Sequence, residues 1–138
     1  MATGTLGTTA RDYPSRGERF CVNLNPTNMS NLSFKIGTIP TGSVIARCTT
    51  INGTTAFGST TNTVALGTAA NGAQIMAAAA IGGAGVITPE TLVTGASSVL
   101  GPLAADTPIW LTTAFTGAAP AAGAASVLVL EWFNPGAL

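Results

Sequence analysis

Apolar and polar residues alternate with a period of two along much of the chain. Phe20, Val22 and Leu24, for example, alternate with Cys21 and Asn23. This period is typical of β-strands, because successive side chains of a strand point to opposite faces of a sheet. Four segments of this kind occupy the first half of the chain. We predict strands over 18–25, 32–37, 43–51 and 62–68.

Two later segments, 107–115 and 125–133, are the clearest strands in the chain. Both have apolar residues on both faces. Strands of this type lie at the centre of a sheet, or in a sheet whose second face is covered by a neighbour. Between them and the first four strands we predict short strands or extended segments at 84–89 and 97–101, around a loop that holds Glu90.

The segment 73–80 is rich in alanine, the best helix former. Asn71 can cap a helix that begins there, and Gly82-Gly83 can end it. We therefore predict one short helix over 73–80.

Residues 1–19 differ from the rest, because they carry five of the ten charged residues. The sequence before Arg11 is rich in Gly and Thr and shows no periodicity. We interpret 1–16 as an extended arm with Tyr13 as an anchor, and Pro14 disfavours a helix there. A solvated tail is the alternative. The expected organisation is an arm over 1–16 followed by a single β-sandwich domain over 17–138.

Seven or eight short strands, separated by turn signals and with little helix, indicate an all-β sandwich or barrel. Only 7 % of the 138 residues are charged, against about 25 % in an average globular chain. A soluble monomer usually carries more charge, because charge opposes association. We interpret the shortage as a surface covered by other subunits. An extracellular β-protein with a surface rich in Thr and Ser is the alternative.

The formal net charge is zero, which argues against binding to nucleic acid and against electrostatic attachment to a membrane. The amino terminus has no apolar stretch typical of a secretion signal. The best candidate for a membrane span, 73–87, is too short and too rich in Ala and Gly to cross a bilayer. We expect no nucleic-acid partner and no membrane association.

Residues that carry chemistry are few. The chain has no histidine, so the commonest general base and metal ligand is missing. We expect Cys21 and Cys48 to be reduced and buried, and we consider a disulfide between them the less favoured reading. Neither a zinc site nor a cofactor site is expected.

The carboxylates are spread along the chain and form no motif: Asp12, Glu18, Glu90, Asp106 and Glu131. Two of them can still converge in space, as a glycosidase requires. Glu131 stands out because its sequence neighbours are apolar. The simplest interpretation is an outward strand position or a salt bridge to Arg47 or Lys35. An enzyme is therefore the least favoured class.

One segment, 34–76, resembles a pattern found in small structural proteins of tailed bacteriophages. Its elements are an Ile-Pro-x-Gly turn at 39–42, a strand, Thr-Thr-Ala-Phe at 54–57, a loop, and a strand that ends in Leu-Gly-Thr at 66–68. The closing strands, one of which holds a second Thr-Thr-Ala-Phe at 112–115, also fit. We expect Phe57 and Phe115 to lie in the core or at the base of a loop. Residues 1–19 have no counterpart in this pattern.

The family that the segment resembles comprises jelly-roll decoration, or cement, proteins of phage heads. The resemblance implies a protein made in the host cytoplasm that binds the exterior of the capsid and bridges subunits of the major capsid protein. It also implies contacts between copies, in a homodimer or homotrimer. The arm is the first candidate for capsid contact, through Arg11, Tyr13, Arg16 and Arg19.

A second hypothesis is a jelly-roll binding module of a phage fibre or tail that recognises carbohydrate on the host surface. Such a site needs exposed aromatic residues, and Trp110, Trp132 and Tyr13 are the candidates. The two tryptophans fall within predicted strands, which favours a place in the core over a sugar platform.

Overall fold

The structure, a computed structural model, describes residues 17–81, 83–93 and 100–135. The elements of these residues are eight strands, listed here in chain order: β1 (Glu18–Leu24), β2 (Ser33–Ile39), β3 (Val44–Asn52), β4 (Thr61–Gly67), β5 (Met76–Ala80), β6 (Ile87–Glu90), β7 (Thr107–Thr116) and β8 (Ser126–Phe133).

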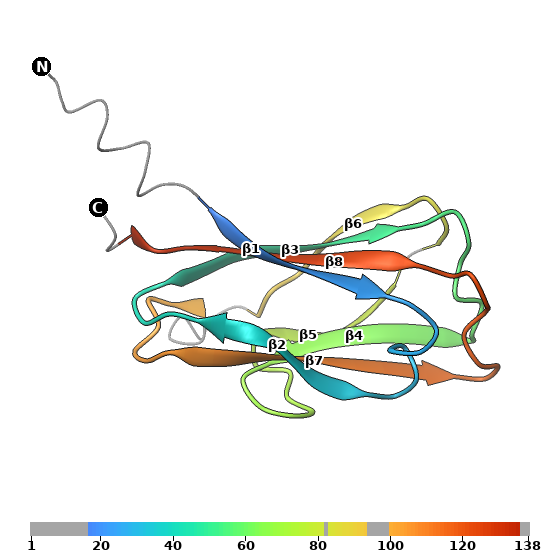
Figure 1. The fold of residues 1–138 in the computed structure, drawn as a ribbon, viewed down its shortest axis with the longest axis horizontal. Helices are drawn as coiled ribbons and strands as arrows, with labels where there is room; N and C mark the ends of the chain where they lie inside the picture. The colour runs from blue at the N-terminus through green and yellow to red at the C-terminus, as the bar shows by residue number, and fades with distance from the viewer. Residues whose placement is uncertain (1–16, 82, 94–99, 136–138) are drawn as a thin grey trace, which may run out of the picture.

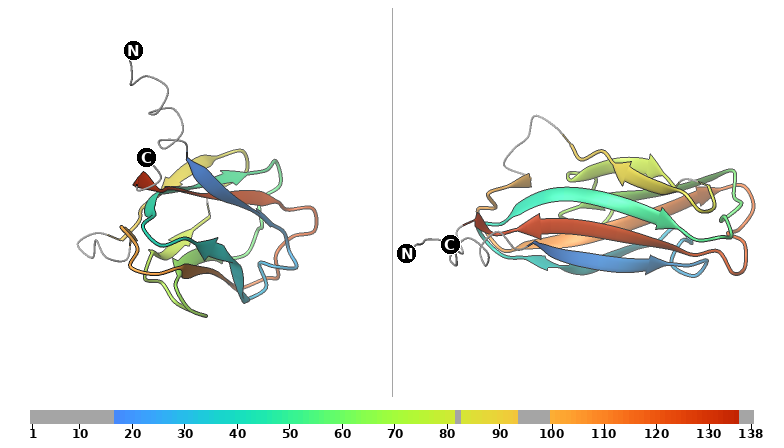
Figure 2. Two further views of the ribbon diagram at one scale, coloured as in Figure 1. Left: turned by 60° about the vertical axis from the view of Figure 1, so that its left-hand side comes forward. Right: turned by 90° about the horizontal axis from the view of Figure 1, so that it is seen from above.

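The strands form two four-stranded sheets, with the orders β1-β8-β3-β6 and β2-β7-β4-β5. All neighbouring strands are antiparallel. The sheets lie one above the other as the two layers of a sandwich (Figures 1 and 2). The first and last strands are neighbours, and the chain passes repeatedly from one sheet to the other. This connectivity is a jelly roll, and it confirms the predicted fold class.

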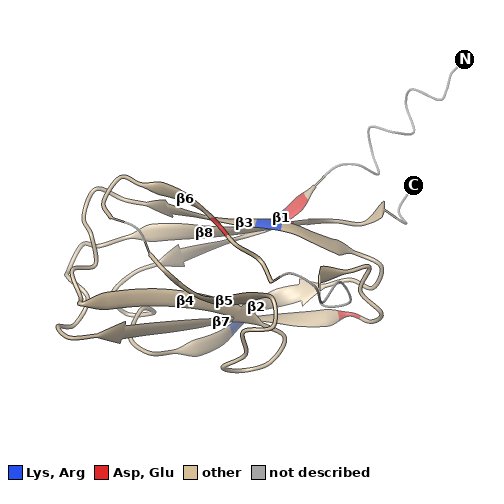
Figure 3. Ribbon diagram, turned by 180° about the vertical axis from the view of Figure 1, so that it is seen from behind, with Lys and Arg blue, Asp and Glu red and all other residues tan. Residues whose placement is uncertain are grey.

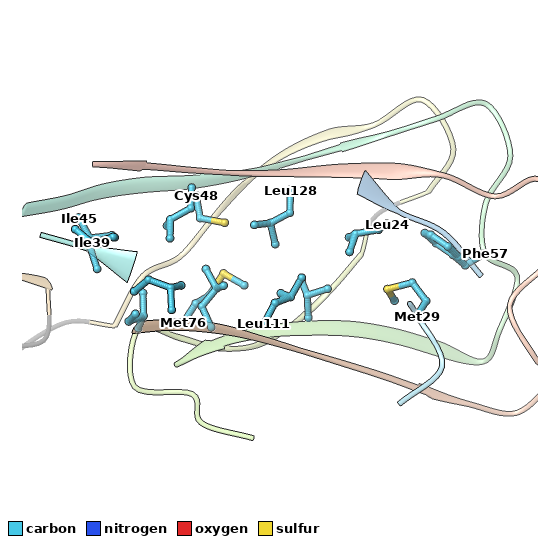
Figure 4. Close-up of a cluster of buried hydrophobic side chains, with 14 of the residues drawn as sticks. Leu24, Met29, Ile39, Ile45, Cys48, Phe57, Met76, Leu111 and Leu128 are labelled. Atoms are coloured by element: carbon cyan, nitrogen blue, oxygen red, sulfur yellow. The ribbon is translucent and has the colours of Figure 1, made fainter. Parts of the chain in front are cut away.

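The core lies between the sheets, where the inward side chains of both layers meet (Figure 4). Leu128 and Leu130 of β8 and Leu111 of β7 are fully buried. Leu24 and Met29 are also buried between the sheets. These two residues and the three leucines named above belong to one continuous apolar cluster. Complete burial of an apolar side chain of this size stabilises the fold by about 1.5–3 kcal/mol.

The four strands predicted from alternation, and the two predicted at 107–115 and 125–133, are confirmed within one or two residues at each end. The segment 84–89 is extended only in part, since β6 begins at Ile87. β6 also includes Glu90, so the prediction that Glu90 lies in a loop is wrong. The predicted segment at 97–101 falls mainly on residues 94–99, outside the described part of the chain.

The helix predicted over 73–80 is wrong. Ile75 and Met76 are fully buried, and β5 pairs with β4 along the edge of the lower sheet. Pairing and burial override the helix propensity of alanine, which amounts to less than about 1 kcal/mol per residue. Asn71 caps no helix: its φ is 60°, and its backbone N–H donates to Ser33 Oγ at 2.9 Å.

The Thr-Thr-Ala-Phe segments occupy different places. Residues 54–57 lie in the connection that leads from β3 to β4 in the other sheet, whereas 112–115 lie within β7. Phe57 belongs to the core, as expected, with 4 % of its surface exposed, and Phe115 is half-buried. The two copies therefore do not mark a repeated structural unit.

Candidate interaction face

The outer surface of the sheet β1-β8-β3-β6, named the β8 face below, carries exposed apolar side chains at one end. The register places outward side chains of neighbouring strands side by side. One row across the face consists of Asn23, Val127, Ile51 and Ile87. Three of its four members are apolar, although they point away from the core.

Exposure confirms this reading of the register. Ile51 and Ile87 are 41 % and 65 % exposed, and Val86, which precedes β6, is 45 % exposed. Among the described residues, Leu32 is the one other large apolar side chain in this class, at 43 %. Scattered apolar residues on a surface are ordinary, but a contiguous group is typical of an interface.

The opposite end of the β8 face is charged. Arg19, Glu131 and Arg47 form a row by register, and Arg47 Nε donates to Glu131 Oε1 at 2.8 Å. The predicted salt bridge of Glu131 to Arg47 is therefore confirmed. Arg19 makes no ion pair with another described residue. This end of the face thus carries two guanidinium groups and one carboxylate. Figure 3 shows positions of both charge signs near one another on this sheet, and few charges elsewhere on the ribbon.

A hollow of about 290 Å³ lies at the apolar end, where the last residues of β1 and β3 flank the first residues of β8. Ile51 and Val127 of the apolar row line it, together with Gly53 and Ala125. Gly53 N–H donates to the Ala125 carbonyl at 2.8 Å, and a Cβ on Gly53 would lie 2.9 Å from that oxygen. The small residues at 53 and 125 keep the hollow open.

The outer surface of the other sheet has a different character. Ser33 and Thr112 hydrogen bond to each other at 3.0 Å across β2 and β7. The connection between β4 and β5, residues 68–75, hangs below this sheet in Figure 1 and is held to it by the bond from Asn71 to Ser33. Part of this second surface is therefore polar and covered by the chain itself.

The two cysteines are separated. Cys48 is buried, as expected, but Cys21 is exposed on the β8 face, so its predicted burial is wrong. β8 lies between their strands, and both thiols are free. Burial raises the pKa of the Cys48 thiol to about 12, and the negative charge of Glu90 adds to the effect.

Two further carboxylates have hydrogen-bond partners in the fold. Glu90 accepts a hydrogen bond from Thr50 Oγ1 at 2.7 Å. Asp106 accepts hydrogen bonds from the backbone N–H and the hydroxyl of Thr41, at 2.9 and 3.0 Å, and these two bonds lower the Asp106 pKa. In the described residues, no cluster of three or more His, Cys, Asp or Glu side chains is arranged to hold a metal ion.

The two tryptophans have different environments. Trp132 packs against the core, with its ring centroid 6.1 Å from that of Phe20, which agrees with the expected core position. Trp110 is half-buried and points outward between Lys35 and Gly67 of the neighbouring strands, so its expected position in the core is wrong. No helix in the described part of the chain is long and apolar enough to span a membrane.

Of the residues predicted to contact a capsid, Arg19 lies at the charged end of the β8 face. Arg11, Tyr13 and Arg16 lie outside the described residues. The apolar row was not predicted as a site. Its signal was present in the segment 125–133, whose two apolar faces suggested a sheet covered by a neighbour.

Three solved structures share this fold. A chain of the capsid of Ralstonia phage GP4 matches with a TM-score of 0.61 and 21 % identity over 86 % of this chain and 83 % of its own. A chain of the cyanophage Pam1 capsid asymmetric unit matches with a TM-score of 0.56 and 16 % identity, over 87 % of this chain and 84 % of its own. A chain of the acid-stable capsid of Helicobacter pylori bacteriophage KHP30 matches with a TM-score of 0.54 and 10 % identity, over 88 % of this chain and 90 % of its own.

No protein-family model and no curated protein sequence matches the chain. At identities of 21 % or less, the likeness to the three phage structures concerns the fold. It extends over most of both chains in each case.

Proposed function

We propose that the chain is a structural, non-enzymatic virion protein that decorates the exterior of a phage capsid and bridges subunits of the major capsid protein. The observation that carries the proposal is the β8 face, a sheet surface with exposed apolar residues at one end, on a chain with very little charge. The shared fold with chains of three phage capsid structures supports it.

The proposed mechanism is mechanical. A subunit that spans two capsomers keeps all of its contacts only while the capsomers hold their spacing, so it stabilises the intact shell. Any ligand that binds one state stabilises that state by RT ln(1 + [L]/Kd), about 2.7 kcal/mol when the free ligand is at 100 times its Kd. Summed over many sites, such a contribution opposes rupture by packaged DNA.

The arm is a further part of the proposal. Arg11, Arg16 and Arg19 are suited to pair with carboxylates of the capsid, and Tyr13 is suited to fill a pocket. A variant that lacks residues 2–16 retains Arg19 and the β8 face. We expect it to bind capsids more weakly than the full chain. Unchanged binding would remove the arm from the interface.

The proposal is tested with capsids of the encoding virus that were assembled without this chain. The purified full chain is added, and bound and free fractions are separated by sedimentation. We expect saturable binding in a fixed ratio to the major capsid protein, and a higher temperature of capsid rupture in the bound state. If the chain stays in the supernatant at all concentrations, the proposed function is wrong.

A further inference from the structure

The β8 face has two distinct ends, and their chemistry restricts the partner that fits it. At one end the apolar row borders a hollow. At the other end, two guanidinium groups stand beside the single carboxylate of Glu131. We infer that this face docks a protein surface that presents a large apolar side chain to the hollow and a carboxylate to Arg19 and Arg47. The inference rests on the proposed function and specifies the capsid surface that the chain recognises.

The spacing of the two contact points follows from β8. Val127 lines the hollow and Glu131 marks the charged row, four residues further along the same strand. Because a strand rises about 3.3 Å per residue, the two points lie about 13 Å apart. An extended segment of the partner matches this distance when its apolar residue and its carboxylate are four positions apart.

The size of the hollow suits one side chain. Its volume of about 290 Å³ lies just below the range of about 300–1,000 Å³ that is typical of small-molecule pockets. The apolar row continues from it through Ile51 to Ile87, so an anchored side chain would have further apolar contact on that side. Binding energy in protein interfaces concentrates in a few side chains that fill well-packed pockets.

The charged end needs a carboxylate from outside the face. Glu131 already accepts a bond from Arg47 Nε at 2.8 Å, and a guanidinium has five N–H donors. The Arg47 side chain is 71 % exposed, so its other donors face solvent. Arg19 has no ionic partner among the described residues. Covering this end with an apolar surface would bury uncompensated positive charge, which is costly.

A second copy of the chain does not satisfy this requirement. A two-fold interface brings the same patch of both copies together. With the axis across the strands, each charged end would lie over the apolar end of the other copy. With the axis along the strands, the two charged rows would face each other, and four guanidinium groups would meet only two carboxylates. A partner that supplies a carboxylate therefore fits the face better than a second copy does.

Two single substitutions test the two contact points. Ala125→Phe places a ring in the hollow from an exposed position, and Ala122→Phe is its matched control in the same connection, away from the hollow. Arg19→Glu reverses a charge that has no described ionic partner, and Lys35→Glu is its control on the opposite sheet. Circular dichroism and thermal melts compare the folding of all four variants.

Binding is measured with the same capsids assembled without this chain. We expect Ala125→Phe and Arg19→Glu each to raise Kd about tenfold or more, while both controls stay within about twofold of the unsubstituted chain. We also expect Arg19→Glu to reduce the dependence of binding on salt. If the unsubstituted chain binds and both test variants bind equally well, the inference is wrong although the proposed function stands.

Two further measurements distinguish the capsid protein from a second copy of the chain as the partner of the β8 face. Analytical ultracentrifugation of the free chain should give the same molar mass for Ala125→Phe, Arg19→Glu and the unsubstituted protein. If either variant abolishes a self-associated form, the face holds a second copy and the inference is wrong. Arg19→Lys followed by carbodiimide coupling should join position 19 to a carboxylate of the capsid protein, identified by mass spectrometry. Coupling to another copy of the chain would also overturn the inference.

Discussion

Replacing Ile51 and Ile87 together by threonine should weaken capsid binding without unfolding the sandwich. Both residues are exposed, at 41 % and 65 %, and threonine keeps the β-branched shape that strands favour. We expect the free energy of unfolding to change by less than about 0.5 kcal/mol per site, as for ordinary surface substitutions. The effect on binding should be much larger.

The magnitude follows from the exposed fractions. Complete burial of an isoleucine contributes about 1.5–3 kcal/mol, so covering the exposed part of Ile87 contributes about 1–2 kcal/mol, and that of Ile51 about two thirds as much. Threonine retains one methyl group, which leaves an expected loss of about 1–3 kcal/mol for the double variant. This corresponds to a rise in Kd of about 5- to 150-fold.

The assay is a titration of capsids assembled without this chain, with bound protein quantified after sedimentation. Leu32→Thr is the matched control, because Leu32 is 43 % exposed but lies outside the β8 face. We expect the control to bind within about twofold of the unsubstituted chain. Equal binding by the double variant and the control, at equal thermal stability, would refute the assignment of this face to the interface.

Four further predictions concern the sandwich itself. Leu128→Ala should lower the free energy of unfolding by about 2–5 kcal/mol in urea titrations, since Leu128 is fully buried; a loss below about 1 kcal/mol would contradict its place in the core. A maleimide should label Cys21 in the native protein and Cys48 only after unfolding. Because the Cys48 pKa is raised from 9.0 to about 12, its contribution to stability should be complete below pH 9 and decline between pH 9 and 12, and Cys48→Ala should flatten this decline. In a carboxyl NMR titration, the pKa of Asp106 should lie below its ordinary value of 3.8. The stabilising effect of the ionised carboxylate should therefore be lost as the pH falls through that lowered pKa. Thr41→Ala should raise the pKa, because it removes the hydrogen bond from the Thr41 hydroxyl.

The strands could be predicted from the sequence because burial of one face imposes a period of two on the residues themselves. Where alanine dominates, as in 73–80, this signal disappears, since alanine is compatible with both faces of a strand and with a helix. Propensity then points to a helix, whereas the free edge of β4 and the burial of Met76 determine a strand. The strand pairing and the burial that determine this structure are made with residues outside the segment, which its local sequence does not reveal.

The site could be predicted only in part. An acid among apolar neighbours in 125–133 suggested the salt bridge of Glu131, but the register of β3 on β8 selects Arg47 over Lys35. The hollow and the apolar row arise because the ends of three strands, distant in the sequence, meet in one sheet. Cys21 was expected in the core because cysteine is commonly buried, although its place opposite Phe20 and Val22 in the alternation puts it on the outer face.

A cryo-EM reconstruction of capsids saturated with the full chain tests the central claim most directly. We expect the sandwich on the exterior of the shell, across a boundary between capsomers, with the β8 face turned toward the major capsid protein and a carboxylate of that protein beside Arg19. Density for the chain with its β8 face turned to solvent, or no density for it on the shell, would contradict the account.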